Sequence, residues 1–433
     1  MNADETYGIH PASRDAESAR GGVNDFGEPT CFSLPGSGAR YSRAPSLTAF
    51  IRADPRFPPR FGPAHRGRSG ARLPTGSAGG DIDGAASEGA PARRSLTPGA
   101  ARRVGEGAPD VHASPRLAVS NAQPVLRRLR GVLAPVVTTF RRDEAIDLDA
   151  FSDNLRAHLA AGLDGIVVAG STGEAALLDD EERARLVAMA RAVVPDERLL
   201  LAGVGAESTR QTVRRCRQAA EQGADAVLCV APHYYTAAMT ADALRVHYRR
   251  VADESPVPVV LYNIPKYMHF ALDAGLVAEL AQHDNVVGIK DSSGDPAILG
   301  GFLQAQSETF TVLTGFGGGV HAALKAGARG GILAVSLFAP AMTREVVDRF
   351  AAGDDAGSAD AQGRLMAVAR EIVGGLGVPG VKAAMDAVGL RGGAVRRPLA
   401  PLPEAAAARV ASLLAEAGLR DAGEPAAAGA AAS

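Results

Sequence analysis

Lysine is scarce in this chain of 433 residues, where only four of the 46 basic residues are lysines. Alanine, glycine and arginine are abundant throughout, so codon bias explains the scarcity and it carries no functional weight. Position is more informative, because Lys290 stands near the end of an apolar run from Val286 to Asp291. A lysine there is either a surface residue whose amine reaches solvent or a residue that does chemistry. Taken alone, its position leaves both interpretations open.

Cysteine, clustered histidine and long apolar runs are lacking as well. Cys31, Cys216 and Cys229 form neither a CxxC pair nor an even framework, which predicts reduced thiols in a cytoplasmic protein. The nine histidines show no HExxH motif and no tight His/Cys/Asp cluster, so we predict no metal and no cofactor. No apolar run reaches the roughly 18 residues that span a bilayer, and the first residues lack the apolar core of a secretory signal. We therefore expect no membrane partner.

Charge of one sign is not in large excess. The formal net charge is -2, with 15 arginines and 12 acidic residues in residues 1–120, which leaves a weakly acidic remainder. Proteins that bind nucleic acid usually carry a basic face, and this chain has no such surplus. The balance argues against nucleic acid as a partner.

The chain divides by composition. Residues 1–125 are rich in Gly, Pro, Ser, Ala and Arg without a sustained helical or strand period, which predicts a disordered low-complexity tail. A mis-called translation start is the alternative, and because no methionine lies between Met1 and Met189, it would use a valine codon such as Val119 or Val125. The Ala-rich residues 421–433 are also predicted to be disordered.

Residues 126–350 alternate short apolar runs with amphipathic stretches. The runs are GVLAPVVTTF, DGIVVAG, RLLLAGVG, DAVLCVAP, VPVVLYNIP, VVGIKDSS, FTVLTG and GGILAVS, and helical patterns between them include 147–161, 179–194, 208–222, 240–252, 274–282 and 297–306. Eight runs with intervening helices predict a (β/α)8 TIM barrel, and runs that are apolar on both faces fit a parallel sheet covered by helices. Residues 351–420 would add C-terminal helices over 362–373, 381–388 and 404–416.

Several polar side chains stand where these runs end. In a parallel barrel the active site lies at the carboxyl ends of the strands, so such residues converge on one rim. A lone tyrosine at a strand end usually packs with its hydroxyl in water, and it is the convergence that favours a site. The residues concerned are Ser171 and Thr172 after the second run, Tyr234 and Tyr235 after the fourth, Tyr262 in the fifth and Lys290 in the sixth.

Residues 131 to about 402 resemble the dihydrodipicolinate synthase and N-acetylneuraminate lyase superfamily. The matching stretches, in family order, are GSTGE, AGVGAESTRQT, GADAVLCVAPHYY, LYNIP, GIKDSSGD and VLTG. Jointly they are specific and cover about two thirds of the chain. The resemblance implies a pyruvate-dependent class I aldolase, condensing enzyme or dehydratase on a (β/α)8 barrel, needing no cofactor and commonly a tetramer built as a dimer of dimers.

The resemblance also implies roles for individual residues. Lys290 would attack the keto carbon of pyruvate as a neutral amine and form a Schiff base, with Tyr262 as the proton shuttle. Ser171 matches the relay hydroxyl, where the synthases have Thr, and Tyr234 matches a tyrosine that enters the neighbouring subunit's site. The pyruvate carboxylate would bind the backbone N–H groups of the GSTGE loop, with Gly170 and Gly173 among its residues, and the hydroxyl of Thr172, since several donors of such a turn can converge on one anion.

Two departures limit what can be said of the second substrate. The synthases have an arginine for the carboxylate of aspartate semialdehyde where this chain has Tyr267, and a phenol cannot replace that bidentate pair. After the seventh run, GFGGG offers none of the acidic and hydroxyl side chains with which sialic acid lyases hold the sugar. We expect a less polar aldehyde or a sugar acid, in a pocket lined by Lys266, Tyr267, His269 and Phe270.

Several functions therefore stay in competition. The favoured one is a Schiff-base aldolase or lyase that joins or separates pyruvate and an aldehyde, with a 2-keto-3-deoxy acid or other 2-oxo acid as the larger substrate. A sugar-acid dehydratase and a dihydrodipicolinate synthase would use the same Schiff base. Loss of Lys290 or Tyr262 would favour a non-catalytic barrel, and both residues are present.

Overall fold

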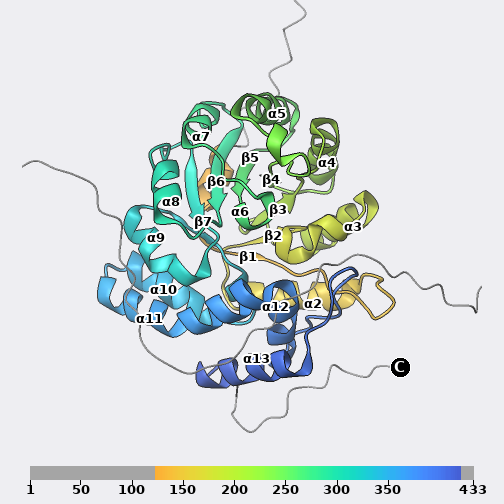
Figure 1. Cartoon of the computed structure of the whole chain (residues 1–433), viewed down its shortest axis with the longest axis vertical. Helices are drawn as coiled ribbons and strands as arrows, with labels where there is room; N and C mark the ends of the chain where they lie inside the picture. The colour runs from red at the N-terminus through yellow and green to blue at the C-terminus, as the bar shows by residue number, and fades with distance from the viewer. Residues whose placement is uncertain (1–121, 421–433) are drawn as a thin grey trace, which may run out of the picture. The chain divides into compact units, whose positions relative to one another are not determined.

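Eight parallel strands close into a barrel in sequential order in the computed structural model, which describes residues 122–420 (Figure 1). Of the predicted tails, residues 1–121 and 421–433 lie outside the described residues, whereas residues 122–125 of the tail predicted over 1–125 are described and begin a helix. The strands are β1 (Gly131–Pro135), β2 (Gly165–Val168), β3 (Leu199–Gly203), β4 (Ala226–Val230), β5 (Val259–Asn263), β6 (Val286–Asp291), β7 (Thr311–Thr314) and β8 (Gly330–Ile332). One strand lies in each predicted apolar run, and the predicted (β/α)8 barrel is confirmed.

The strands are apolar on both faces because both faces are covered. All five residues of β3 are buried, and so are all five of β5. One face of each strand fills the barrel interior, and the other packs against the surrounding helices, as is usual for all-parallel sheets. Figure 1 shows α3, α4, α5, α7, α8 and α9 arranged around the strands.

The helices that follow the strands begin where short polar side chains can cap them. Asp147, Asp179, Ser208 and Thr240, the predicted starts of four helices, are N-caps whose side chains accept a backbone N–H. Asp179 completes a capping box with Glu182. The helices up to the barrel's closure are α1 (Ala122–Arg128), α2 (Leu148–Ala160), α3 (Asp180–Val193), α4 (Thr209–Glu221), α5 (Ala241–Glu254), α6 (Pro265–Met268), α7 (Ala274–Leu280), α8 (Pro296–Leu303), α9 (Val320–Ala326) and α10 (Pro340–Ala351).

Helix α1 was not predicted, and the expected boundary at residue 126 falls inside it. Its Val125 and Leu126 are buried, and Leu129 just beyond it is fully buried beside Gly288 of β6. Three apolar residues within five positions are too few to produce a detectable helical period. The barrel therefore begins a few residues earlier than the composition indicates.

Up to residue 420, where the described part of the chain ends, four further elements follow the barrel: α11 (Asp355–Ala367), the π-helix η7 (Val368–Leu376), α12 (Gly377–Ala387) and α13 (Glu404–Glu416). The bounds of α13 are those predicted, whereas the helix expected over 362–373 spans the junction of α11 and η7. Figure 1 shows α11, α12 and α13 grouped on one side, next to α10. Helix α12 contacts two short 3-10 turns, η2 (Ser171–Gly173) after β2 and η6 (Ala334–Leu337) after β8, so the C-terminal helices border the rim where the strands end.

None of the helices between residues 122 and 420 combines the length and the apolarity needed to cross a membrane.

Candidate active site

Lys290 and Tyr262 are neighbours on adjacent strands. Their Cα atoms are register partners between β5 and β6, and both residues are buried, with 5% and 4% of their surface exposed. The Lys290 Nζ lies 4.2 Å from the centroid of the Tyr262 ring. The structure thus brings together the two residues that the sequence singled out for amine and phenol chemistry.

The space around the Lys290 amine is left open by a glycine. A Cβ on Gly315, directly after β7, would lie 2.7 Å from the Lys290 Cε and would also collide with the Ser292 hydroxyl. Among the described residues, no carboxylate lies within ion-pair distance of the Lys290 amine. The next residue, Asp291, faces away and accepts hydrogen bonds from Asn263 and Ser293.

The GSTGE loop follows β2 and is held in a strained conformation. Ala169 before it and Glu174 at its end have positive φ angles of 52° and 57°, which cost a non-glycine residue on the order of 1–3 kcal/mol each. Gly173 is required by close approach, because a Cβ there would lie 2.9 Å from the Val136 carbonyl. The Thr138 hydroxyl donates to the Gly173 carbonyl at 2.7 Å.

This loop presents unused backbone donors. The Gly170 carbonyl accepts the N–H groups of Gly173 and Ala175, and the Ser171 carbonyl accepts that of Glu174. Within residues 122–420, the N–H groups of Ser171 and Thr172 donate to no protein acceptor. Two adjacent free N–H groups at the start of a helical turn form a concave site that suits an anion such as a carboxylate.

A buried ion pair ties the loop to the C-terminal helices. The Lys382 Nζ of α12 lies 2.5 Å from Glu174 Oε1, and the two side chains are 2% and 0% exposed. The ammonium also donates to the Ala394 carbonyl at 2.6 Å, and the Arg396 N–H donates to the other oxygen of Glu174 at 2.9 Å. Burial lowers the pKa of Lys382, and the neighbouring Glu174 carboxylate opposes that shift.

A second buried cation, Arg183 of α3, holds the same loop by its backbone. It donates to the carbonyls of Ala175 and Gly203, each at 2.8 Å, and to that of Ala169 at 3.4 Å. Ala169 and Ala175 flank the GSTGE loop. The loop is therefore held at both ends by side chains from outside it.

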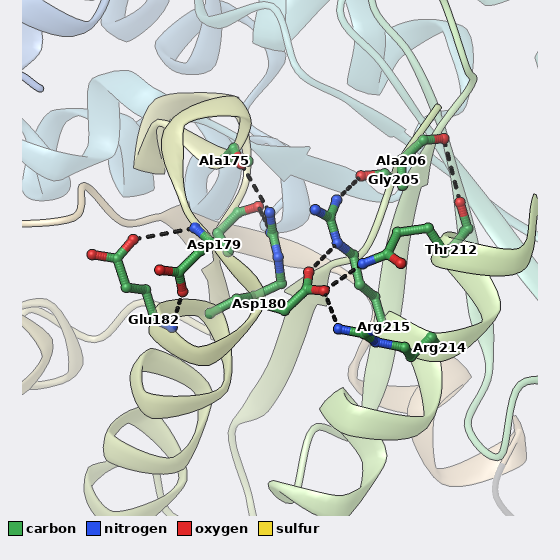
Figure 2. A network of polar contacts seen from close by, with 12 residues as sticks. Ala175, Asp179, Asp180, Glu182, Gly205, Ala206, Thr212, Arg214 and Arg215 are labelled. Carbon is green, nitrogen blue, oxygen red and sulfur yellow. Dashed lines mark hydrogen bonds and ion pairs between the residues drawn. The ribbon is translucent and has the colours of Figure 1, made fainter. Parts of the chain in front are cut away.

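A polar network joins α3 to α4 beside the site (Figure 2). The Asp180 carboxylate accepts from Arg215 at 2.9 Å, from Arg214 at 2.6 Å and from Gln211. Although burial raises the pKa of Asp180, these hydrogen bonds and charges lower it below its ordinary value. The Arg215 guanidinium also donates to the Gly205 carbonyl at 2.6 Å, so it is both neutralised and fixed in place.

A cavity of about 1210 Å³ opens at this rim, and Ser171, Lys266 and Tyr267 are among the residues that line it. The Lys266 ammonium donates to the Gly374 carbonyl of η7 at 3.0 Å, which places the C-terminal segment along the cavity wall. Tyr267 is 41% exposed, and its partial burial raises its pKa. Tyr234 is 76% exposed with its ring against Tyr235 and is not among the described residues that line the cavity. Of the predicted site residues, Ser171, Lys266 and Tyr267 line the cavity, whereas its lining does not include Tyr234, Lys290, Tyr262, Thr172, Gly170, Gly173, His269 or Phe270.

The profile of the Dihydrodipicolinate synthetase family matches residues 128–417, which include all of these side chains. The chain belongs to the dihydrodipicolinate synthetase family. Members are lyases of the class I aldolase type, which make or break a carbon–carbon bond, and this chain is such an enzyme.

Relatives and solved structures agree with this assignment. The 4-hydroxy-tetrahydrodipicolinate synthase of Xanthomonas axonopodis pv. citri is 40% identical over 220 residues, 51% of this chain and 72% of that protein. An uncharacterized DapA-like lyase of Halobacterium salinarum is 37% identical over 291 residues, 67% of this chain and 95% of that protein. The crystal structure of YagE, a prophage protein of the dihydrodipicolinic acid synthase family from E. coli K12 in complex with pyruvate, matches with a TM-score of 0.64 and 28% identity. That match covers 67% of this chain and 99% of YagE.

Sequence reasoning missed the residues that hold the family's glycine-rich loop. Thr138 follows β1, Arg183 lies in α3, Glu174 belongs to the loop itself and Lys382 lies in α12. The one signal in the sequence was chemical, since Lys382 is a lone cation in an apolar helical stretch. Its partner, 208 positions away, could not be inferred from one sequence.

Proposed function

We propose that this enzyme is a pyruvate-dependent aldolase that uses Lys290 as its Schiff-base nucleophile. The supporting observation is a buried amine, 4.2 Å from the centroid of the Tyr262 ring and without a carboxylate at ion-pair distance among the described residues. A loop with unused N–H donors follows a strand of the same rim. A neutral amine, an acid–base phenol and an anion site are the groups that imine chemistry on a 2-oxo acid requires.

In the proposed reaction the Lys290 Nζ attacks the keto carbon of pyruvate, and the carbinolamine loses water to give an iminium ion. Loss of a methyl proton gives the enamine, whose carbon adds to the carbonyl of an aldehyde. Hydrolysis of the resulting iminium returns the amine and releases a 4-hydroxy-2-oxo acid. Cleavage of a 2-keto-3-deoxy acid follows the same steps in reverse.

Tyr262 is assigned the proton transfers, because its ring packs against the amine on the neighbouring strand. Ser171, at the cavity wall, is assigned the relay between the phenol and the substrate. The pyruvate carboxylate is assigned to the free N–H groups of Ser171 and Thr172 and to the Thr172 hydroxyl, with Gly170 and Gly173 giving the loop its shape.

The aldehyde partner is assigned to the cavity beside Tyr267. Its wall combines the apolar Leu376 and Leu399 with Tyr267 and with charged side chains such as Lys266 and Glu207, which suits a less polar aldehyde or a sugar acid. Arg396 does not replace the missing arginine, since its guanidinium is committed to Glu182 and to the carbonyls of Leu177 and Glu144.

We propose that Tyr234 completes the site of a second copy of the chain, in a homotetramer built as a dimer of dimers. An exposed pair of aromatic rings, Tyr234 and Tyr235, stands beside the cavity and suits burial against another subunit. We also propose a cytoplasmic location, with Cys216 and Cys229 as buried, unpaired thiols in support.

Reductive trapping tests the mechanism directly. Pyruvate with borohydride should convert Lys290 into a stable secondary amine, which mass spectrometry finds on the peptide carrying that residue. The other three lysines serve as internal controls, and Lys382 is informative because it is also buried. Lys290→Met should abolish the adduct while retaining the fold. An adduct on Lys266, Lys325 or Lys382 with Lys290 unmodified would refute the assignment.

Dihydrodipicolinate synthase is the second candidate, because the Xanthomonas relative carries that activity in its name. Tyr267 argues against it: loss of a charge-assisted pair at a desolvated site costs roughly 2–5 kcal/mol, about 30- to 5,000-fold in specificity. We expect poor turnover of pyruvate with aspartate semialdehyde in a coupled assay, and Tyr267→Arg should raise it. Turnover equal to that of an authentic synthase would show that this chain catalyses the synthase reaction. A dehydratase, the third possibility, would consume a sugar acid without releasing pyruvate.

A further inference from the structure

Arg183 is a buried cation that forms an ion pair with none of the acidic side chains in residues 122–420. Only 4% of its surface is exposed, and its hydrogen bonds within the described chain all go to backbone carbonyls. Placing a charge in the interior is unfavourable unless it is compensated, so such a residue is retained for a reason.

The nearest acidic residues of the same helix are engaged elsewhere. Asp180 is bound by Arg214 and Arg215, and Asp179 caps the helix by accepting the Glu182 N–H. Burial lowers the pKa of Arg183 to about 10, so the guanidinium is still charged at neutral pH. The charges of Asp180 and Asp179 favour the guanidinium from a distance but neither carboxylate pairs with it, so a positive charge lies beside the GSTGE loop.

The contacts of Arg183 enclose this loop from both ends. One nitrogen binds the Ala175 carbonyl, whose hydrogen bond is drawn in Figure 2, and the other binds those of Gly203 and Ala169. The carbonyl and the N–H of one peptide unit point in opposite directions. With the Ala169 carbonyl turned toward the guanidinium, the N–H of Gly170 is turned away from it, on the side where the loop's free donors begin.

We propose that Arg183 is a positioning residue that sets the affinity for the substrate's carboxylate by holding the GSTGE loop with its N–H groups aimed at that anion. The charge of Arg183 reinforces the attraction from behind the loop. The proposal rests on the proposed function, because it assumes a 2-oxo acid bound beside Lys290. It separates two roles: Lys290 and Tyr262 carry the bond changes, and Arg183 carries the recognition of the anion.

The test compares how pyruvate saturates the borohydride trapping of Lys290 in four variants, of which Arg183→Ala leaves space for added guanidinium. Arg183→Met removes the charge and all three hydrogen bonds, and Arg183→Lys keeps the charge with fewer bonds. Arg191→Met is the matched control, since Arg191 belongs to the same helix but binds the Gly223 carbonyl at the opposite end.

We expect the half-saturating pyruvate concentration to rise about 10- to 100-fold in Arg183→Met, by the usual worth of hydrogen bonds to a charged group. The rate at saturating pyruvate should change less than about threefold, because the reacting groups are untouched. Arg183→Lys should lie between, Arg191→Met should saturate like the parent enzyme, and added guanidinium should restore saturation to Arg183→Ala.

Each outcome decides between the possible roles. An unchanged half-saturating concentration in the Arg183 variants, with trapping intact in the parent enzyme, refutes the positioning role alone. A lower rate at saturation without a change in half-saturation assigns Arg183 to structure only and also refutes it. If Arg183→Met does not fold, Arg183→Lys and the guanidinium experiment carry the same decision. Absence of trapping in the parent enzyme would instead refute the proposed function.

Discussion

The ion pair between Glu174 and Lys382 can be tested by removing one charge at a time. Lys382→Met keeps a side chain of similar length but deletes the ammonium, which leaves the Glu174 carboxylate fully buried with the Arg396 N–H as a remaining donor. Breaking a buried pair on one side typically costs about 3–5 kcal/mol. That is a large part of the roughly 5–15 kcal/mol by which a folded protein is stable.

Removing the charge of Glu174 should lower the free energy of unfolding less than removing that of Lys382, because the hydrogen bonds that remain to the two partners are not equal. In Glu174→Gln the Lys382 ammonium keeps the Ala394 carbonyl at 2.6 Å, so a penalty of about 1–3 kcal/mol is expected. The double variant Glu174→Gln/Lys382→Met contains no buried charge at this position. It should be more stable than Lys382→Met alone, since an apolar replacement of a whole pair is often nearly neutral.

Chemical unfolding in urea at pH 7, followed by circular dichroism, measures these differences as a double-mutant cycle. Lys325→Met is the matched control, because Lys325 forms an exposed pair with Asp355 and should have little effect. If Lys382→Met is no more damaging than Lys325→Met, or if the double variant gains nothing over it, the buried pair does not hold the loop to the C-terminal helices as described.

Two further predictions concern the shuttle and the pH response. Tyr262→Phe should keep the fold but slow turnover by on the order of 10²-fold, and Ser171→Ala should lose less because water can replace a relay hydroxyl; near-native turnover of Tyr262→Phe would contradict the assignment. His158 is buried, and burial lowers its pKa from 6.5 to about 4, so between these pH values the unfolded chain binds a proton that the folded chain does not. The contribution of His158 to the free energy of unfolding is complete above pH 6.5 and is lost as the pH falls toward 4, by up to roughly 3 kcal/mol. Urea unfolding at several pH values should show that the free energy of unfolding depends less on pH in His158→Gln than in the parent protein. Equal slopes in the two proteins would contradict this role of His158.

The barrel was predictable because its signals are local. Runs such as RLLLAGVG are apolar on both faces, which few structures other than a covered parallel strand can accommodate. Asp147, Asp179 and Ser208 indicate helix starts, because each caps the first turn of the helix that follows it. Lys290 and Tyr262 could be placed together for the same reason, since strand ends in a barrel share one rim.

The support of the site was not predictable, because it depends on pairs that are distant along the chain. Nothing near Lys382 indicates that it meets Glu174, and nothing near Arg183 shows that its partners are carbonyls instead of acids. The continuation of α11 into a π-helix also escaped prediction, since Gly374, Gly375 and Gly377 suggest a break after residue 373. Such features depend on tertiary packing, which overrides local preference.

Gly315 limits how this barrel can change its substrate. A side chain at that position would occupy the volume in which the Lys290 amine has to move, so the end of β7 is closed to mutations that add a recognition group. New specificity must instead arise where side chains already face the cavity without crowding the amine, at Lys266 and Tyr267 and in the segment from Gly375 to Pro379. An engineer who wants a different aldehyde should diversify those positions and leave the glycine alone.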